Sequence, residues 1–153
     1  MKGGPKNPAS SLLGLVRAMR DCCQRQEGEM CRKLALTVSQ FGCLLAMPEP
    51  AGELNVHQVA KVMGLSASRA SRIVDSLVRS GWLDRRTMDS DRRTQLLTLT
   101  PAGQEKWHLA HKLLTECEKR LLAHLPPQRS QEMQETLQTL INAWGTGLRP
   151  SQW

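Results

Sequence analysis

The stretch SASRASRIVDSLVRSGWLDRRTMDSDRRTQLLTLTPAG, from Ser66 to Gly103, is the most informative part of this chain. Its first half has apolar residues at helical spacing, arginines on the polar face and Gly81 as a stop. This pattern predicts an amphipathic helix capped by a serine at 66 or 68. Two runs with strand character follow, at 82–88 and 95–100, with aspartates and a serine between them to form a turn. The stretch therefore predicts a helix followed by a hairpin rich in arginine.

The segments before this stretch complete a helix-turn-helix pattern. Asn55 is the candidate N-cap of the helix VHQVAKVMG, and Gly64 is its stop. A helix, a tight glycine-containing turn and a second helix together form the pattern. Further upstream, Thr37 or Ser39 can cap a helix that Pro48 ends. This order suits a protein that lays a helix in a DNA groove and rests a basic hairpin on the neighbouring backbone.

Long helices are expected on both sides of this segment. The first starts near residue 9 or 10 and runs to about residue 36. Another begins at Pro101, because proline suits the first position of a helix. Pro126 and Pro127 break it before a last helix at about 128–144. The fold class predicted for the chain is therefore mainly α with a small β-hairpin.

Charge is concentrated in the same region. The chain has 153 residues, a formal net charge of +7 and a sequence pI near 9.6. From Lys61 to Arg93 there are eight basic residues against four acidic ones, so over half of the net charge lies in about a fifth of the chain. A basic soluble domain attracts polyanions, and nucleic acid is the commonest of them. This distribution favours a DNA-binding face over charge that serves solubility alone.

The sequence also indicates where in the cell the protein is found. No secretion signal is visible, and no apolar run approaches the ~20 residues that a membrane span needs. We therefore expect a cytoplasmic protein that does not associate with membranes. The five cysteines are an odd count, which argues against a structural disulfide framework.

Three strings of this sequence resemble the MarR family, the winged-helix regulators named for multiple antibiotic resistance. They are LTVSQFGCLLAM from Leu36, VHQVAKVMGLSASRASRIVDSLVRSGWLDRR from Val56 and DSDRRTQLLTLTPAGQEKW from Asp89. The last is the most specific, because an Asp-x-Asp-Arg-Arg tip followed by Leu-Thr-Pro-x-Gly is close to a family signature. The flanking helices fit in length and order, so the resemblance extends over nearly the whole chain.

The resemblance implies a homodimer built from the first and the last two helices. It divides the chain into a helical dimerisation region at 9–36 and 101–148 and a winged helix-turn-helix region at 37–100. The composition of residues 1–8, rich in Gly and Pro, predicts a flexible arm before them, and residues 149–153 form a tail. The resemblance also implies one recognition helix in each subunit. Repression, or less often activation, would be relieved by a small ligand or by oxidation.

The candidate DNA contacts lie in two groups. Those on the recognition helix are Ser66, Ser68, Arg69, Ser71 and Arg72. An arginine can donate two hydrogen bonds to guanine, worth ~1–3 kcal/mol of discrimination. For Ser66 the role of helix cap is favoured over a DNA contact. The family resemblance places the second group on the hairpin, called the wing, where arginines enter the minor groove or hold its phosphates; these are Arg85, Arg86, Arg92 and Arg93. Asp91 is the candidate for orienting one of them, since a carboxylate can fix a guanidinium by paired hydrogen bonds.

Cysteines supply candidates for a redox sensor. Cys22, Cys23 and Cys31 lie on the first helix, with several arginines near in sequence to stabilise a thiolate. Adjacent cysteines rarely bridge each other, so a disulfide would go to Cys31 or to the other subunit. The alternative is that the cysteines fill a core rich in leucine and alanine, and this is favoured for Cys43 and Cys117.

The effector site has further candidates by position. Arg17, Arg20, Phe41 and Trp107 could line a ligand pocket, although core packing is favoured for the two aromatic residues. His108 and His111 are three apart on one helix and are candidates for metal ligands. Without a CxxC or HExxH pattern, surface or interface histidines are favoured, so neither a metal site nor a cofactor is predicted.

These patterns together predict a dimeric, sequence-specific transcriptional regulator. We expect a repressor whose DNA affinity changes with a small ligand or with cysteine oxidation, and a metal-responsive regulator is the alternative. Its partners would be a pseudo-palindromic duplex with half-sites ~10 bp apart, a second copy of the chain and a small-molecule effector. A thiol-dependent enzyme is disfavoured, because there is no Gly-rich cofactor loop, CxxC pair or recognisable Ser-His-Asp order. An interaction module that uses the same scaffold without DNA is disfavoured by the concentration of arginines.

Overall fold

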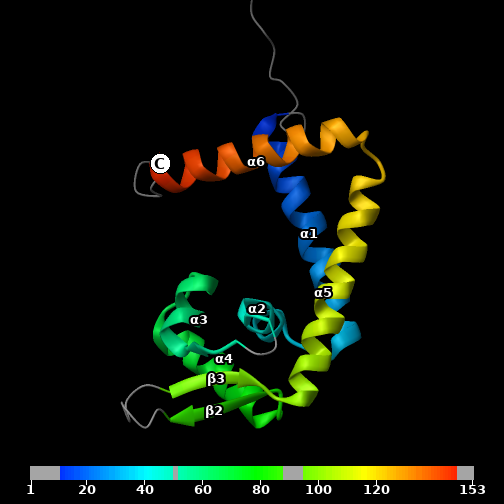
Figure 1. The fold of residues 1–153 in the computed structure, drawn as a ribbon. Helices are drawn as coiled ribbons and strands as arrows, with labels where there is room; N and C mark the ends of the chain where they lie inside the picture. The colour runs from blue at the N-terminus through cyan, green and yellow to red at the C-terminus, as the bar shows by residue number, and fades with distance from the viewer. Residues whose placement is uncertain (1–10, 50–51, 88–94, 148–153) are drawn as a thin grey trace, which may run out of the picture. The chain divides into compact units, whose positions relative to one another are not determined.

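A computed structural model of the chain describes residues 11–49, 52–87 and 95–147. By internal packing the chain divides into two compact units, Met1–Leu113 and Leu114–Trp153. The elements in chain order are α1 (Leu12–Leu34), α2 (Val38–Ala46), β1 (Leu54–Asn55), α3 (Val56–Met63), α4 (Ala67–Arg79), β2 (Leu83–Thr87), β3 (Gln95–Leu99), α5 (Pro101–Leu122) and α6 (Pro127–Gly147) (Figure 1).

The helix-turn-helix consists of α3 and α4. The Asn55 side chain accepts a hydrogen bond from the Gln58 amide, and the Gln58 side chain accepts one from the Asn55 amide, so both form a capping box. Gly64 follows with a φ of 64°, a left-handed conformation that glycine adopts without strain. Ser66 then caps α4 by accepting from the Arg69 amide. These contacts confirm the predicted caps at Asn55 and Ser66 and the predicted stop at Gly64.

The neighbouring helices are also capped by their own side chains. Thr37, and not Ser39, is the N-cap of α2, in a capping box with Gln40. Ser11 caps α1 by accepting from the Gly14 amide, so α1 begins at Leu12, slightly later than predicted. Each of these bounds follows from hydroxyl or amide side chains that satisfy the free N–H groups of a first turn.

The three strands form one antiparallel sheet in the order β1-β3-β2. Leu97 pairs with Leu54 of β1 and with Arg85 of β2, and Leu99 pairs with Leu83. Leu97 and Leu99 are buried, whereas Leu96 and Thr98 are half-buried, as the alternation of leucine with threonine at 97–100 predicts. The wing is the β2–β3 hairpin, which extends from the helix-turn-helix (Figure 1). Its predicted turn, residues 88–94, lies outside the described residues.

One apolar core holds this first unit together. Its largest fully buried side chains come from α2, α3, α4 and the sheet, and they are Phe41, Leu44, Leu77, Leu83, Leu97, Val59, Val74 and Cys43. Burying one such aliphatic side chain is worth about 1.5–3 kcal/mol. Leucine and valine therefore supply most of the packing that fixes α4 and the wing.

The second unit contains the end of α5 and all of α6. None of its described side chains at 114–143 is buried in the single chain. Leu121, Leu137 and Ile141 are exposed there, and Ile141 has 61% of its surface accessible. In the first unit, the start of α1 likewise exposes Leu12 and Leu15. Among the described residues, no helix is both long and apolar enough to cross a membrane.

Candidate nucleic-acid interface

The polar face of α4 is the most accessible part of the candidate site. Ser68, Arg69 and Arg72 are exposed, and Ser71 is half-buried. The opposite face, with Ala70 and other apolar residues at helical spacing, is buried in the core. The helix is therefore fixed by one side and presents two guanidinium groups, three residues apart, on the other.

Ser66 is the N-cap of α4, the role that the sequence analysis predicted for it. Its hydroxyl oxygen accepts from the Arg69 amide at 3.3 Å, which satisfies one of the free N–H groups at the start of α4. The hydroxyl group keeps its own hydrogen as a donor. A DNA contact by Ser66 stays a prediction that is compatible with the cap.

The start of α2 lies against the middle of α4. The Gln40 side-chain amide donates to the Ser76 hydroxyl at 2.7 Å and joins the two helices. Beside this contact is a pocket of about 280 Å³, formed by Thr37, Ser39, Gln40, Arg69, Arg72, Ile73 and Ser76. Arg69 and Arg72 therefore line a concave surface that α2 and α4 share. The sequence did not identify Gln40 or Ser76, because nothing in their local pattern marks the contact.

On the wing, Arg85 is bound to the recognition helix. Its Nη2 donates to Oδ1 of Asp75 at 2.6 Å, and 27% of the Arg85 side chain is exposed against 40% for Asp75. The Nε of Arg85 is buried, and the described residues give it no hydrogen-bond acceptor. This pair joins β2 to the second half of α4, so Arg85 helps to fix the angle between the helix and the wing.

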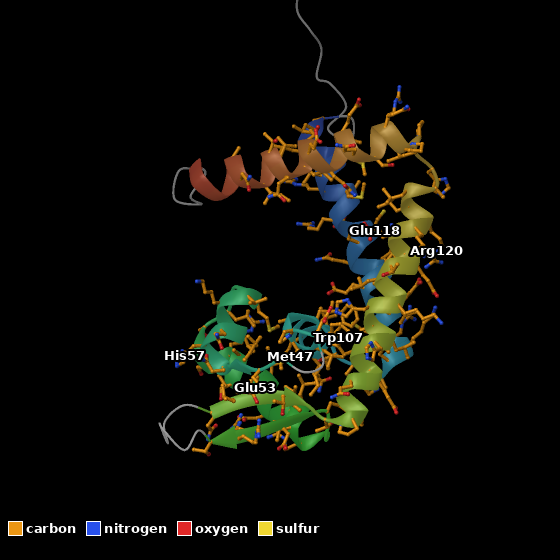
Figure 2. All side chains as sticks on the ribbon, in the orientation of Figure 1. Met47, Glu53, His57, Trp107, Glu118 and Arg120 are labelled. Atoms are coloured by element: carbon orange, nitrogen blue, oxygen red, sulfur yellow. The ribbon has the colours of Figure 1, made fainter. Side chains whose placement is uncertain are left out.

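Arg86 is paired as well, but in a more exposed position. Its Nη2 lies 2.5 Å from Oε1 of Glu53, just before β1, and 68% of its side chain is exposed. Such a surface pair is worth about 0–1 kcal/mol, so a phosphate can compete for this guanidinium at little cost. Figure 2 labels Glu53 at the sheet.

The acids that orient these two arginines were not among the sequence predictions. Asp75 and Glu53 hold Arg85 and Arg86, whereas the predicted orienting residue Asp91 lies outside the described residues, together with Arg92 and Arg93. One available signal was that Asp75 is the only acid within the basic helix at 67–79. Contacts of Arg85 and Arg86 with DNA stay predictions, and each would have to share its guanidinium group with a carboxylate.

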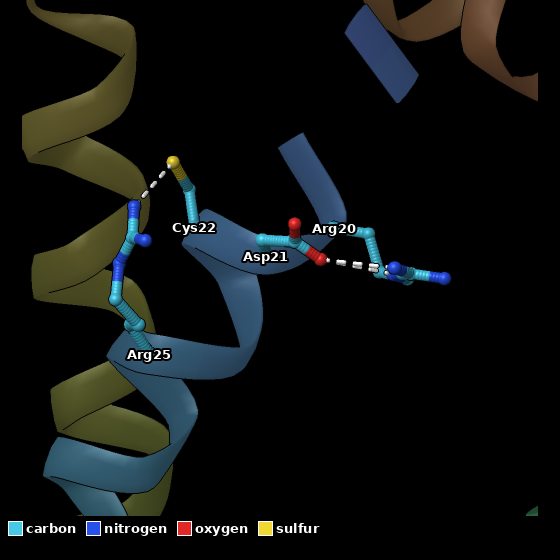
Figure 3. A network of polar contacts seen from close by, with 4 residues as sticks. All are labelled: Arg20, Asp21, Cys22 and Arg25. Carbon is cyan, nitrogen blue, oxygen red and sulfur yellow. Dashed lines mark hydrogen bonds and ion pairs between the residues drawn. The ribbon is translucent and has the colours of Figure 1, made fainter. Parts of the chain in front are cut away.

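The candidate redox cysteines fall into two environments. Cys22 and Cys23 are exposed on α1. Figure 3 shows Nη2 of Arg25 donating to Sγ of Cys22 at 3.1 Å, while Arg20 pairs with Asp21 at 3.0 Å. Both sulfur atoms are therefore accessible to an oxidant, and that of Cys22 lies against a guanidinium group.

The remaining cysteines are less accessible. Burial, with a contribution from Glu27, raises the pKa of the Cys31 thiol. Burial alone raises the pKa of Cys43 to about 12, so this thiol stays protonated and unreactive at neutral pH. Cys117 is half-buried. The core-filling interpretation thus fits Cys43 well and fits Cys31 better than a sensing role does.

The structure also restricts which cysteines could form a disulfide. Cys22, Cys23 and Cys31 lie on one continuous helix, α1. At 1.5 Å per residue, Cys31 is ~12–14 Å along the axis from the pair, far beyond the 4.4–6.8 Å between Cα atoms that a disulfide allows. The expectation of a bridge to Cys31 within one chain is therefore wrong for this conformation. A bridge between subunits stays a prediction.

The four candidates for a ligand pocket have different environments in the structure. Arg17 and Arg20 are exposed on α1, whereas Phe41 is 1% exposed and belongs to the core. The indole Nε1 of Trp107 donates to the carbonyl oxygen of Met47 at 3.1 Å, and Figure 2 labels both residues where α5 meets the end of α2. Packing and anchoring account for the two aromatic residues.

The two candidate metal ligands both contact Trp107. The His111 ring lies 4.0 Å from the indole between centroids, and the His108 ring lies 5.2 Å away, edge to face. Within the described part of the chain, no group of three His, Cys, Asp or Glu residues is placed to hold a metal ion. His108 is exposed and His111 is half-buried, and the role of both as packing residues stays a prediction.

Comparison with known proteins adds family relationships. A family model described as the MarR family matches residues 36–94. The uncharacterized HTH-type transcriptional regulator YfiV of Bacillus subtilis is 32% identical over 118 residues, which are 72% of this chain and 69% of YfiV. The HTH-type transcriptional regulator BilQ of Clostridium symbiosum is 29% identical over 83 residues, or 54% of this chain, and the match spans 58% of BilQ.

The fold is also similar to solved structures. The crystal structure of the MepR–DNA complex from S. aureus superposes with a TM-score of 0.75 at 18% identity, covering 87% of this chain and 98% of MepR. At this level of identity the similarity establishes the fold, and it agrees with the predicted winged helix-turn-helix.

Proposed function

Because this chain belongs to the MarR family of transcriptional regulators, we propose that it represses transcription by binding a pseudo-palindromic duplex as a homodimer. The proposal places α4 of each subunit in the major groove and the wing on the adjacent backbone. Ser68, Arg69, Ser71 and Arg72 are the proposed contacts of α4, with Ser66 in addition to its role as cap. Arg85, Arg86, Arg92 and Arg93 are those of the wing, with Asp91 as an orienting residue.

The observation that carries this proposal is the geometry of α4. One face of the helix is fixed in the core, and the opposite face exposes Arg69 and Arg72 three residues apart. Guanidinium groups so placed match the O6 and N7 acceptors of guanine in the major groove. The similarity in fold to MepR, which was solved in complex with DNA, supports DNA binding by this chain.

Exposed apolar residues support the homodimer. Leu12 and Leu15 at the start of α1 are 62% and 56% exposed in the single chain, and Leu137 and Ile141 of α6 are exposed as well. Apolar residues gathered on helices in this way mark protein–protein interfaces. A second copy of the chain is the proposed occupant, since α1, α5 and α6 form the dimerisation region in the domain division given above.

Binding of a duplex from the chain's own promoter region tests the function. Fluorescence anisotropy should show a dissociation constant that rises steeply with salt, because each phosphate contact contributes about 0.9 to the slope of log affinity against log salt. The double variant Arg69→Ala with Arg72→Ala should bind at least ~30-fold more weakly, as expected for the loss of two contacts worth ~1–3 kcal/mol each.

A charge-matched control is available on another helix. Arg32→Ala with Lys33→Ala removes the same charge from exposed positions of α1 and should leave affinity within about threefold of the original, since surface charges away from a contact act weakly. Equal binding by the α4 double variant and the original chain, both folded and dimeric, would refute the proposal.

For the effector, the exposed thiols favour oxidation over the other candidates. Cys22 is exposed and next to Arg25, and Cys23 is exposed beside it. Hydrogen peroxide should weaken promoter binding, reductant should restore it, and Cys22→Ser or Cys23→Ser should abolish the response. If zinc or a phenolic acid releases the DNA while peroxide does not, the metal-responsive or the ligand-responsive alternative replaces this part of the proposal.

A further inference from the structure

The start of α5 is pressed against the exit of the recognition helix. After α4 the chain turns at Gly81, whose φ is 74°, and continues through Trp82 into β2. The Thr100 hydroxyl donates to the Gly81 carbonyl at 2.6 Å, and the Thr100 amide donates to the Trp82 carbonyl at 3.2 Å. A Cβ atom added to Gly103 would lie 1.9 Å from that same Trp82 carbonyl oxygen. The backbones of α5 and of the turn after α4 are therefore in direct contact.

Lys106 extends this contact to a third element. Its Nζ lies 4.5 Å from the centre of the Trp82 ring, within the range of a cation–π interaction. The same ammonium group donates to the carbonyl oxygen of Leu34, the last residue of α1, at 2.6 Å. One side chain thus joins Trp82, which follows the turn after α4, to the end of α1.

The end of α1 needs such a donor. The last four carbonyl groups of a helix have no partner within it, and the dipole of the helix favours a cation there. The backbone amides of Ala35 and Leu36 donate to the carbonyl groups of Arg32 and Cys31. The carbonyl group of Leu34 is therefore left for another donor. The Leu34 side chain is buried, so its carbonyl group has limited access to water. Lys106 supplies both the hydrogen bond and the positive charge.

The next residue anchors α5 in the same way to α2. Trp107 donates its indole N–H to Met47, the C-cap of α2, at 3.1 Å. Two consecutive side chains of α5 therefore hold the ends of α1 and α2, and one of them also holds the exit of α4. Since α1 and α5 belong to the proposed dimerisation region, this junction lies on the route from the dimer to the recognition helix.

We propose that Lys106 is a positioning residue for DNA binding: its bridge between Leu34 and Trp82 fixes the recognition helix relative to α1 and so sets the separation of the two recognition helices in a dimer. The inference rests on the proposed function of binding a two-half-site duplex. Lys106 acts through α1 and Trp82 and does not contact the DNA, because its ammonium group is engaged at both.

The test uses a duplex that the full chain selects from a random pool, and versions of that duplex with base pairs added between its half-sites. Lys106→Met keeps the aliphatic stem but removes the donor and the charge. We expect it to bind the selected duplex about tenfold more weakly, which corresponds to ~1.4 kcal/mol. It should also discriminate less against the altered spacings, because the recognition helices are no longer held at one separation.

Two comparisons separate positioning from other roles. Lys112→Met removes the same charge from an exposed position of α5 and should bind like the original chain. The slope of log affinity against log salt should be unchanged in Lys106→Met, whereas loss of a direct phosphate contact would lower it by about 0.9. Lys106→Arg, which retains a donor and a cation, should recover most of the affinity and the spacing preference.

Three results would contradict the positioning role of Lys106. Unchanged affinity and spacing preference in Lys106→Met, a reduced salt slope, or a loss in Lys106→Arg equal to that in Lys106→Met would overturn the inference. If Lys106→Met does not fold, as judged by circular dichroism, Lys106→Gln is measured in its place with the same expectations. Failure of the original chain to select any duplex would instead overturn the proposed function itself.

Discussion

At the residue scale, the arginines of the candidate interface differ in what holds them. Arg69 and Arg72 are exposed on α4. Arg85 and Arg86 are each paired with an acid, at 2.6 Å and 2.5 Å. An exposed guanidinium is available to read a base, whereas a paired one first serves to fix the structure. We therefore expect sequence specificity to depend more on α4 than on the two described arginines of the wing.

Glycines give a residue-scale prediction about stability. Gly103→Ala should lower the free energy of unfolding by at least ~2 kcal/mol, because the added methyl group would overlap the rigid Trp82 carbonyl, 1.9 Å away. Urea unfolding followed by circular dichroism measures the change.

Gly28→Ala is the matched control for this substitution. Gly28 lies in the middle of α1 with nothing within 4 Å of an added Cβ, so alanine should stabilise the chain by ~0.5–1 kcal/mol. A Gly103→Ala variant as stable as the original chain would show that the contact between α5 and the turn after α4 is absent in solution.

At the scale of elements, α4 is held from two sides by side chains far away in the sequence. Gln40 of α2 contacts Ser76, and Arg85 of β2 contacts the neighbouring Asp75. These contacts fix the second half of α4, and the first half is left to present its polar face. The angle between the recognition helix and the wing is therefore set by a few polar contacts added to the apolar core.

The pair between α4 and β2 leads to a prediction at this scale. Asp75→Asn should lower the free energy of unfolding by about 1 kcal/mol, because Arg85, whose Nε is buried, loses its charged acceptor. The estimate is at the low end for a charged hydrogen bond because Asp75 is 40% exposed and solvent screens the pair.

Glu53→Gln provides the comparison for Asp75→Asn. It weakens the more exposed pair with Arg86 and should change the free energy of unfolding by less than ~0.5 kcal/mol. Both variants are to be measured at pH 7 in urea. An equal effect of the two substitutions would contradict a special role for the contact between α4 and β2.

At the scale of the whole molecule, exposed apolar residues of the first and last helices support the proposed dimer. Leu12, Leu15, Leu137 and Ile141 are all accessible in a single chain, and burying such residues is the main driving force for association. The proposed DNA contacts would then occur twice, related by a two-fold axis, and the operator would share this symmetry.

Dimerisation gives the prediction at this scale. Leu15→Glu places a charge among the apolar residues of α1 and should shift the chain toward the monomer at micromolar concentration, as measured by sedimentation. DNA affinity should fall with it, since both half-sites can no longer be bound together.

A control of similar exposure is Val62→Glu on α3. Val62 is 64% exposed and lies outside the proposed dimerisation region, so this variant should sediment like the original chain. A Leu15→Glu variant that remains a dimer would exclude the start of α1 from the interface.

Much of the fold was determined by the sequence alone. The caps at Asn55 and Ser66, the left-handed Gly64 and the alternation around Leu97 were predicted correctly. Each depends on residues within a few positions of one another, so local conformational preferences and hydrogen bonds decide it. The polar face of α4 followed in the same way from the periodicity of the helix.

Which charged and reactive groups contact one another depends on the packing of the elements. Asp75 and Glu53 as partners of the wing arginines, the bridge from Lys106 to Leu34 and Trp82, and the contrast between exposed Cys22 and buried Cys31 were not among the sequence predictions. The two ion pairs and the Lys106–Leu34 bond join residues 10, 33 and 72 positions apart. Such contacts depend on how elements pack, and no local pattern records the distance between two side chains that the fold brings together.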